Sequence, residues 1–248
     1  MRSMGFLEHL EELRRRIVFS LIAIVICFCG CWFAAPRLVG IMQKPIVEVL
    51  HKNGQPEKLV YQHPVDPFNL YVKTAGVAGL FVASPLVLYQ LWLFVAPGLY
   101  RKEKRYVLPF MLSTVGLFLL GGYFAYRIVL PNALKVLIVG FGTQFQPMIT
   151  IEEYTSLFVT IIVGIGVVFE MPILVFFLAL MGIVSPGWMW RNIRYSILGI
   201  FIVAAIIAPP DIVNMCIFAA PMIALYVLSI GIAWFVHPSR RKARAQQT

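Results

Sequence analysis

Two glutamates lie beside clusters of basic residues at the ends of hydrophobic segments. Glu103 stands inside "YRKEKRY" (residues 100–106), and Glu12 closely precedes three consecutive arginines at positions 14–16. A carboxylate can bind a guanidinium through two parallel hydrogen bonds, which lysine cannot reproduce, so either glutamate could bind an arginine of another molecule. Alternatively, each forms solvated ion pairs with its basic neighbours, worth less than about 1 kcal/mol. The residues alone favour this second, structural interpretation.

Glu170 is a carboxylate inside a hydrophobic run, "VVFEMPILVFF" (residues 167–177). At the centre of a membrane-spanning helix such a group costs about 2.5–3.5 kcal/mol or more, and it usually faces a cavity or an interior partner. In the functional interpretation Glu170 makes such an interior contact. In the structural interpretation it is protonated, or bonded to backbone groups that Pro172 leaves free, and only sets the packing. The two interpretations carry similar weight.

No metal or nucleophilic site is indicated by the remaining residues. Cys27, Cys29 and Cys31 lie in a hydrophobic run, where Cys29 points away from the i,i+4 pair, and they are interpreted as small hydrophobic residues. The four histidines lie in separate segments and form no His-Glu-x-x-His pair. One buried glutamate without a second catalytic group is not a mechanism. We therefore expect no enzymatic activity and no cofactor.

Three further features predict local structure. Asp211 stands just before a hydrophobic segment and is a candidate cap for its helix. Arg127 is interpreted as an anchor that closes a span at the outer face of the membrane. Ala75, Gly79 and Ala83 form a stripe of small residues at four-residue spacing, a pattern typical of close helix packing in membranes.

The composition places the chain in a membrane. Of its 248 residues, 60% are hydrophobic and 13% are charged, and the mean hydropathy is +0.84, whereas soluble domains are about 45–50% apolar. Since no linker rich in Gly, Ser or Pro divides the sequence, residues 1–248 are expected to form a single integral membrane domain. The net charge of +10 does not indicate nucleic acid, because Lys and Arg occur in short clusters between hydrophobic segments.

The hydrophobic segments predict an all-α polytopic membrane protein with six transmembrane helices. A helix needs about 20 apolar residues to cross about 30 Å of hydrocarbon. The predicted spans are residues 17–35, 68–96, 106–126, 154–180, 195–208 and 212–236. The fifth is unusually short, at roughly 21 Å for a rise of about 1.5 Å per residue, because the paired prolines of "APPD" force a tight reversal after it.

The distribution of basic residues predicts that both termini are cytoplasmic. With six spans, both termini and two of the connections share one side of the membrane. That side carries 14 of the 21 basic residues: Arg2, Arg14, Arg15, Arg16, Arg101, Lys102, Lys104, Arg105, Arg191, Arg194, Arg240, Arg241, Lys242 and Arg244. Excess positive charge marks the cytoplasmic face. Residues 1–16 are then a cytoplasmic amphipathic segment and residues 237–248 a basic cytoplasmic tail, while residues 37–50 form an amphipathic helix along the outer surface.

Four motifs occur in an order that resembles the TatC family of the twin-arginine protein translocase. They are "FLEHLEELRRRIV", "SPLVLYQLWLFVAPGLYRKEKR", "FEMP" and "APPD". The resemblance extends from Phe6 to about Val236. It implies a concave, glove-like bundle in the bacterial cytoplasmic (inner) membrane that acts as a receptor for folded cargo with twin-arginine signal peptides. It also implies transport driven by the proton-motive force.

The resemblance assigns roles to particular residues. Glu12 and Glu103 become the partners of the signal-peptide arginines, and Arg14 and Phe94 the supporting surface. The polar groups within the membrane that could contact partners are Gln90, Glu170 and Asp211. The implied partners are single-span subunits of the TatA and TatB type, signal peptides of folded cargo, the lipid bilayer and further copies of the complex, with no nucleic acid.

One site departs from the family pattern, and one alternative function stays open. Where many members carry hydroxyl or amide side chains near "APPD", this sequence has Ala208 and Met215, with Asn214 nearby. The sequence therefore leaves open whether a polar partner-binding cluster exists there. The alternative is a proton-coupled transporter of small solutes that uses Glu170, although the sequence lacks two matching halves with broken helices.

Overall fold

The computed structural model describes residues 6–95, 107–140, 148–180, 182–209 and 211–236. These residues are mostly helical, and within them the only pairing of extended segments is one isolated bridge between Val60 and Thr150. The helices are α1 (Phe6–Phe33), α2 (Ala35–Lys52), α3 (Asp66–Val95), α4 (Val107–Phe124), α5 (Leu130–Lys135), α6 (Ile151–Val168), α7 (Met171–Leu180), α8 (Pro186–Arg191), α9 (Ile193–Ile207) and α10 (Ile212–Val236). The all-α prediction is confirmed for this part of the chain.

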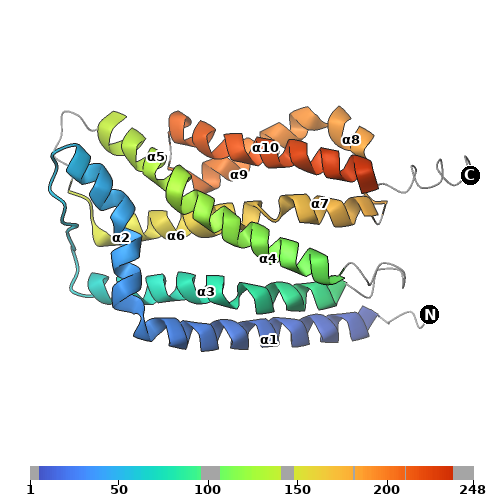
Figure 1. The fold of residues 1–248 in the computed structure, drawn as a ribbon, viewed down its shortest axis with the longest axis horizontal. Helices are drawn as coiled ribbons and strands as arrows, with labels where there is room; N and C mark the ends of the chain where they lie inside the picture. The colour runs from blue at the N-terminus through green and yellow to red at the C-terminus, as the bar shows by residue number, and fades with distance from the viewer. Residues whose placement is uncertain (1–5, 96–106, 141–147, 181, 210, 237–248) are drawn as a thin grey trace, which may run out of the picture.

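Five of the described helical segments are long and apolar enough to cross a membrane. They are Leu10–Phe33, Asp66–Phe94, Met111–Gly140, Ile151–Leu180 and Ile212–Trp234. The apolar helix α9 has 15 residues and covers roughly 22 Å, less than the hydrocarbon core of about 30 Å. The predicted shortness of this segment is confirmed. The helix α1 begins and α10 ends at the same end of the bundle, where α3 ends and α4 begins (Figure 1).

The third hydrophobic segment is longer than the sequence predicted. The predicted span, residues 106–126, was closed by Arg127, but two π-helical turns carry the helix on beyond α5. Pro131 does not end the helix because the turn before it widens. There the N–H of Leu130 donates to the carbonyl of Ala125, five residues back. The helix therefore continues beyond the predicted span, and Arg127 is exposed on it. The predicted anchoring role of Arg127 at the membrane surface stays a prediction.

The helices α1 and α3 lie side by side along their length (Figure 1), and they pack along the predicted stripe of small residues. Ala75 and Ala83 are fully buried. A Cβ atom added to Gly79 would lie 2.8 Å from the Cα atom of Phe28 in α1. Only a residue without a side chain permits so close an approach of two helix backbones. The predicted packing role of the stripe is confirmed.

The helix α2 runs across the ends of α1 and α3 rather than along them (Figure 1) and is held by two tyrosine hydroxyls. Pro45 lies inside α2 and lacks the N–H that would bond the carbonyl of Ile41. Tyr126 donates to that carbonyl at 2.8 Å, and Tyr154 of α6 donates to the carbonyl of Met42 at 2.5 Å. The predicted helix is confirmed, and its position on the outer surface of the membrane stays a prediction.

Two other local predictions concern helix ends and interruptions. Asp211 caps α10, since its Oδ1 accepts the N–H of Asn214 at 2.7 Å, which confirms the predicted cap. Within α3, Pro85 leaves the carbonyl of Phe81 without its usual N–H donor. The hydroxyl of Ser84 donates to this carbonyl at 2.8 Å, so the helix continues through the proline with the freed group satisfied.

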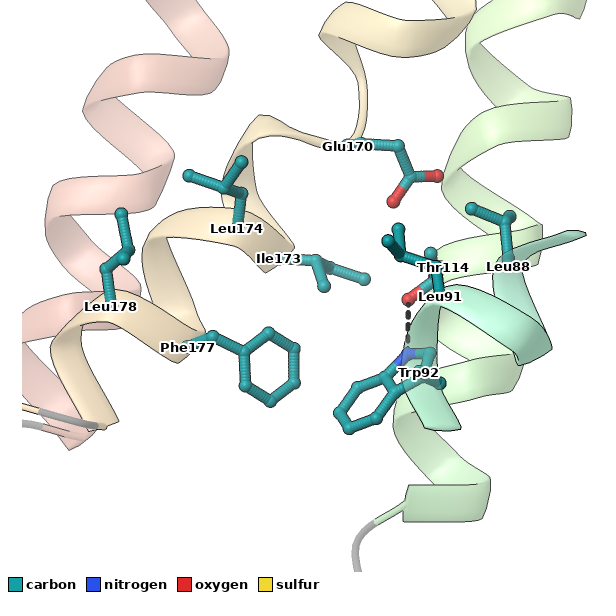
Figure 2. Close-up of a pocket in the computed structure, with 9 residues that line it drawn as sticks. All are labelled: Leu88, Leu91, Trp92, Thr114, Glu170, Ile173, Leu174, Phe177 and Leu178. Atoms are coloured by element: carbon teal, nitrogen blue, oxygen red, sulfur yellow. Dashed lines mark hydrogen bonds between the residues drawn. The ribbon is translucent and has the colours of Figure 1, made fainter. Parts of the chain in front are cut away.

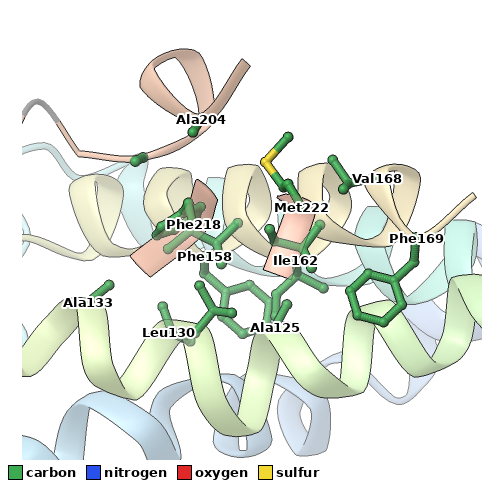
Figure 3. Packing of buried hydrophobic residues seen from close by; sticks show 14 of the residues in the cluster. Ala125, Leu130, Ala133, Phe158, Ile162, Val168, Phe169, Ala204, Phe218 and Met222 are labelled. Carbon is green, nitrogen blue, oxygen red and sulfur yellow. The ribbon is translucent and has the colours of Figure 1, made fainter. Parts of the chain in front are cut away.

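A buried hydrophobic cluster joins α2 and the α4–α5 region to α6, α7, α9 and α10. Figure 3 shows Phe158 and Ile162 of α6 among Leu130 of α5 and Met222 of α10. Fully buried side chains on three of these elements, Leu130, Ile161 and Phe218, identify the centre of the packing. The cluster therefore connects α2 to the helices that follow α3, whereas α1 packs mainly on α3.

We expect Gly79→Ala to loosen the α1–α3 contact. The added methyl group would meet backbone atoms of Phe28, which cannot turn aside as a flexible side chain can. Overpacking of this kind costs about 1–3 kcal/mol, so the thermal unfolding midpoint in detergent should fall. Gly76→Ala is the matched control, since no atom lies within 4 Å of its Cβ position. Equal midpoints for the two variants would contradict this account of the packing.

Candidate functional site

A polar cluster links α1 to α3 at the end of the bundle where α1 begins. Arg16 donates from Nη2 to Oε1 of Glu12 at 3.1 Å and from Nη1 to Oε1 of Gln90 at 3.1 Å. The Arg16 and Glu12 side chains are 25% and 18% exposed. The pair is therefore more shielded than an ordinary surface ion pair, and Coulomb attraction within it is stronger.

The local sequence explains the contact between Arg16 and Glu12, and the packing of the helices explains the contact between Arg16 and Gln90. Glu12 and Arg16 are spaced i,i+4 on one helix, with the acid on the N-terminal side, which is the favourable order for such a pair. Gln90 is 74 residues away in the chain and is brought into reach by the packing of α1 against α3. Sequence reasoning treated Arg16 only as part of a basic cluster, although the i,i+4 spacing was a signal that could have been used.

Two atoms of the cluster are buried and have no hydrogen-bond partner among the residues that the structure describes. They are Oε2 of Glu12 and Nε of Arg16. A buried polar atom without a partner is costly, about 1–3 kcal/mol. The carboxylate of Glu12 therefore has one oxygen occupied by Arg16 and a second oxygen still able to accept a hydrogen bond.

The other residues predicted for signal-peptide binding lie on the same two helices or outside the described residues. Arg14 is on α1 and exposed, and Phe94 is half-buried in the last turn of α3. Arg15, between Arg14 and Arg16, lies 5.7 Å from the ring of Phe19. Glu103 falls in the segment 96–106, outside the described residues, so its predicted role stays a prediction.

The helical path from α6 to α7 is interrupted at Glu170. The carbonyl of Glu170 accepts the N–H groups of Ile173 and Leu174 at 3.1 and 3.0 Å, and its own N–H donates to Val167 at 3.0 Å. Pro172 has no N–H to continue the preceding helix. The oxygen Oε1 of Glu170 is buried and has no partner within the described part of the chain. For this oxygen, the predicted bond to freed backbone groups is not formed.

Glu170 lies at the edge of a cavity of about 310 Å³ between α3, α4 and α7. Figure 2 shows its carboxyl group on the side of Thr114, with Trp92 and Phe177 farther along the cavity. The indole of Trp92 donates to the hydroxyl of Thr114 at 3.5 Å, and the rings of Trp92 and Phe177 meet edge to face at 4.4 Å. The lining residues are Leu88, Leu91, Trp92, Thr114, Glu170, Ile173, Leu174, Phe177 and Leu178. The cavity is thus mostly apolar, with the carboxyl group of Glu170 at its edge.

The turn between α9 and α10 presents few polar groups outward. Asn214 is fully buried and donates from its side chain to Oδ2 of Asp211 at 2.7 Å. Ala208 is buried and Met215 is half-buried. The two polar residues at this turn therefore bind one another. The predicted partner contact of Asp211 stays a prediction.

One polar link was not predicted. Lys73 of α3 forms an ion pair with Glu152 of α6 and donates to Ser156 at 3.2 Å. This link joins α3 to α6 near the end of the bundle that α2 crosses. Within the described residues, no three His, Cys, Asp or Glu side chains are grouped so as to bind a metal ion.

Comparison with known proteins gives one consistent family. The family model described as "Sec-independent protein translocase protein (TatC)" matches residues 8–221. A Sec-independent protein translocase protein TatC from Koribacter versatilis is 63% identical over 247 residues, which are 99% of this chain and 91% of the relative. The TatC protein from Aquifex aeolicus is 37% identical over 248 residues, covering 98% of this chain and all of the relative.

A solved structure shares the fold as well as the sequence. The crystal structure of a twin arginine translocase receptor, TatC, matches with a TM-score of 0.82 and 35% sequence identity. The match covers 92% of this chain and 99% of the other. The similarity therefore includes the helices that carry Glu12, Arg16 and Gln90 and the helices that line the cavity beside Glu170.

Proposed function

The chain belongs to the TatC family of Sec-independent protein translocase proteins, and from this premise we propose that it binds twin-arginine signal peptides of folded cargo. It is a multi-pass membrane protein and a translocase component. In the proposal, the signal-peptide arginines bind Glu12 and Glu103 at the end of the bundle where α1 begins. Arg14 and Phe94 form the surrounding surface.

The observation that carries the proposal is the burial and hydrogen bonding of the Glu12 carboxylate. It is mostly buried and held on one oxygen by Arg16, and its other oxygen has no partner among the residues that the structure describes. A guanidinium N–H supplies what the second oxygen lacks, a charged donor with fixed direction. Glu103 is nine residues beyond Phe94, in the segment that joins α3 to α4, and both of these helices have ends near the Glu12 end of α1 (Figure 1).

The wider proposal places the protein in the bacterial inner membrane with six spans and both termini in the cytoplasm. Single-span subunits of the TatA and TatB type would assemble beside it, and the proton-motive force would drive transport. Glu170 would contact a polar group of a partner helix or signal peptide that enters its cavity. Together with the family's role in protein translocation, this cavity on α3, α4 and α7 supports a binding function for Glu170.

The topology is tested by reporter fusions after Gly54 and after Lys242. We expect the two fusions to report opposite sides of the membrane, with residue 242 in the cytoplasm, because 14 of the 21 basic residues lie on that side in the six-span arrangement. A fusion after Phe33, the last residue of α1, provides a control for the outer side. Reports from the same side after Gly54 and after Lys242 would refute the arrangement.

Replacing Glu103 with Gln should weaken signal-peptide binding while leaving the protein folded and inserted. A hydrogen bond to a charged group at a shielded site contributes about 1.5–3 kcal/mol, or about ten- to a hundredfold in affinity. Glu12→Ala should act in the same direction. If both carboxylates bind one arginine pair, the loss in the double variant should be smaller than the sum of the two single losses.

The measurement for Glu103 is the affinity of purified protein for a peptide with Arg-Arg compared with one with Lys-Lys. We expect wild type to prefer Arg-Arg and Glu103→Gln to lose most of this preference. Glu153→Gln is a control, because Glu153 is exposed and lies on α6. An unchanged preference in Glu103→Gln would show that Glu103 only balances its basic neighbours.

Glu170→Ala should keep the protein inserted and stable but impair cargo export. Within the described residues its Oε1 has no partner to lose, so the unfolding midpoint in detergent should be close to that of wild type or above it. Ile173→Ala enlarges the same cavity without removing the carboxyl group and should keep export. Normal export by Glu170→Ala would leave Glu170 with a packing role only.

A further inference from the structure

We propose that Arg16 is a positioning residue for the signal-peptide site. It holds the carboxylate of Glu12 in place through one oxygen and leaves the other oxygen for the incoming arginine. This inference rests on the proposed function and adds a residue and a mechanism to it. It starts from the bridge that Arg16 makes between Glu12 on α1 and Gln90 on α3.

The bridge fixes Glu12 because Arg16 is held from two directions. Nη2 bonds the carboxylate and Nη1 bonds the amide oxygen of Gln90, both at 3.1 Å. The guanidinium is planar and its N–H groups have fixed directions, so two simultaneous bonds leave it little rotational freedom. Without the bond to α3, an i,i+4 pair on a single helix is weak and mobile.

The hydrogen bonds of this pair leave one buried acceptor, Oε2 of Glu12, and one buried donor, Nε of Arg16, without partners among the described residues. A carboxylate has two oxygens with about four acceptor sites, and in Glu12 only Oε1 is bonded to Arg16. The other oxygen, Oε2, is buried without a partner among the described residues. Arg16 therefore does not fill the site. Oε2 is desolvated and its position is restricted, so an arginine that displaces the groups covering it meets a preorganised acceptor.

The identity of the second anchor supports a positioning role rather than simple charge balance. Gln90 is neutral, so it orients Arg16 without competing for its charge, as a second carboxylate would. The cation of Arg16 by itself repels an arginine peptide. The variant Arg16→Lys keeps the positive charge but lacks the planar guanidinium with its N–H groups in fixed directions. It therefore distinguishes the effect of orientation from the effect of charge.

The experiment measures the affinity of the full-length protein in detergent for an Arg-Arg signal peptide and its Lys-Lys counterpart. The variants are Arg16→Lys, Gln90→Leu, Glu12→Gln and the double variant Arg16→Lys with Glu12→Gln. Arg15→Lys is the matched control, since it makes the same chemical change on an exposed neighbour in α1. Unfolding midpoints are measured for every variant.

Arg16→Lys should lower affinity for the Arg-Arg peptide about tenfold and reduce the preference over Lys-Lys. Gln90→Leu should have the same two effects, and it tests the inference if Arg16→Lys does not fold. Arg15→Lys should leave affinity and preference close to those of wild type. In the Glu12→Gln background, Arg16→Lys should cause no further loss, because the residue acts through that carboxylate.

Three results would overturn the inference. They are an unchanged preference in both Arg16→Lys and Gln90→Leu, an equal loss with and without the Glu12 carboxylate, and a gain in affinity, which would make Arg16 a competitor of the peptide. Failure of the proposed function is distinguishable from these. It would appear as a wild type without preference for Arg-Arg, whereas wild-type preference that Glu12→Gln removes and Arg16→Lys retains would refute only the positioning role.

Discussion

The structure depends on one constraint: inside a bilayer, backbone polar groups must find their hydrogen bonds within the protein. Prolines inside the helices test this constraint, since each removes a donor to the carbonyl four residues earlier. At Pro85 of α3 the hydroxyl of Ser84 replaces the donor. The hydroxyl of Tyr126 does the same at Pro45 of α2, the helix predicted to lie on the outer surface. At Pro172 the helix is interrupted instead, and α6 gives way to α7.

The interruption at Pro172 and the packing of α1 on α3 place the carboxyl groups of Glu170 and Glu12 in different surroundings. Glu12 is held by Arg16 on one oxygen and is otherwise shielded, so its charge is balanced and its position fixed. Glu170 lies beside an apolar cavity with one oxygen unpaired among the described residues. The first arrangement suits a charged, directional donor such as guanidinium, while the second leaves a carboxyl oxygen beside apolar side chains.

Polar links between distant helices hold the bundle where apolar packing does not select one arrangement. Lipid tails are as apolar as leucine, so helices in a membrane associate through close packing at small residues and through interhelical hydrogen bonds. Gly79 provides close packing at a small residue, between α1 and α3. Interhelical hydrogen bonds come from Lys73 with Glu152. They also come from the hydroxyl of Tyr226, which donates to the carbonyl of Met189 and accepts from Ser196.

The sequence by itself determined the membrane class, the helical segments with the short fifth one, the cap at Asp211 and the packing role of Gly79. These depend on composition, on hydrophobic length and on contacts within a few residues of one another. Only the tertiary structure decided that Arg16 meets Gln90 and that the cavity beside Glu170 is built from α3, α4 and α7. It also showed that the third helix continues past Arg127, through a widened turn that hydrophobic periodicity does not reveal. Such contacts depend on how whole helices pack and on their register, and residues 74 positions apart carry no local signal of it.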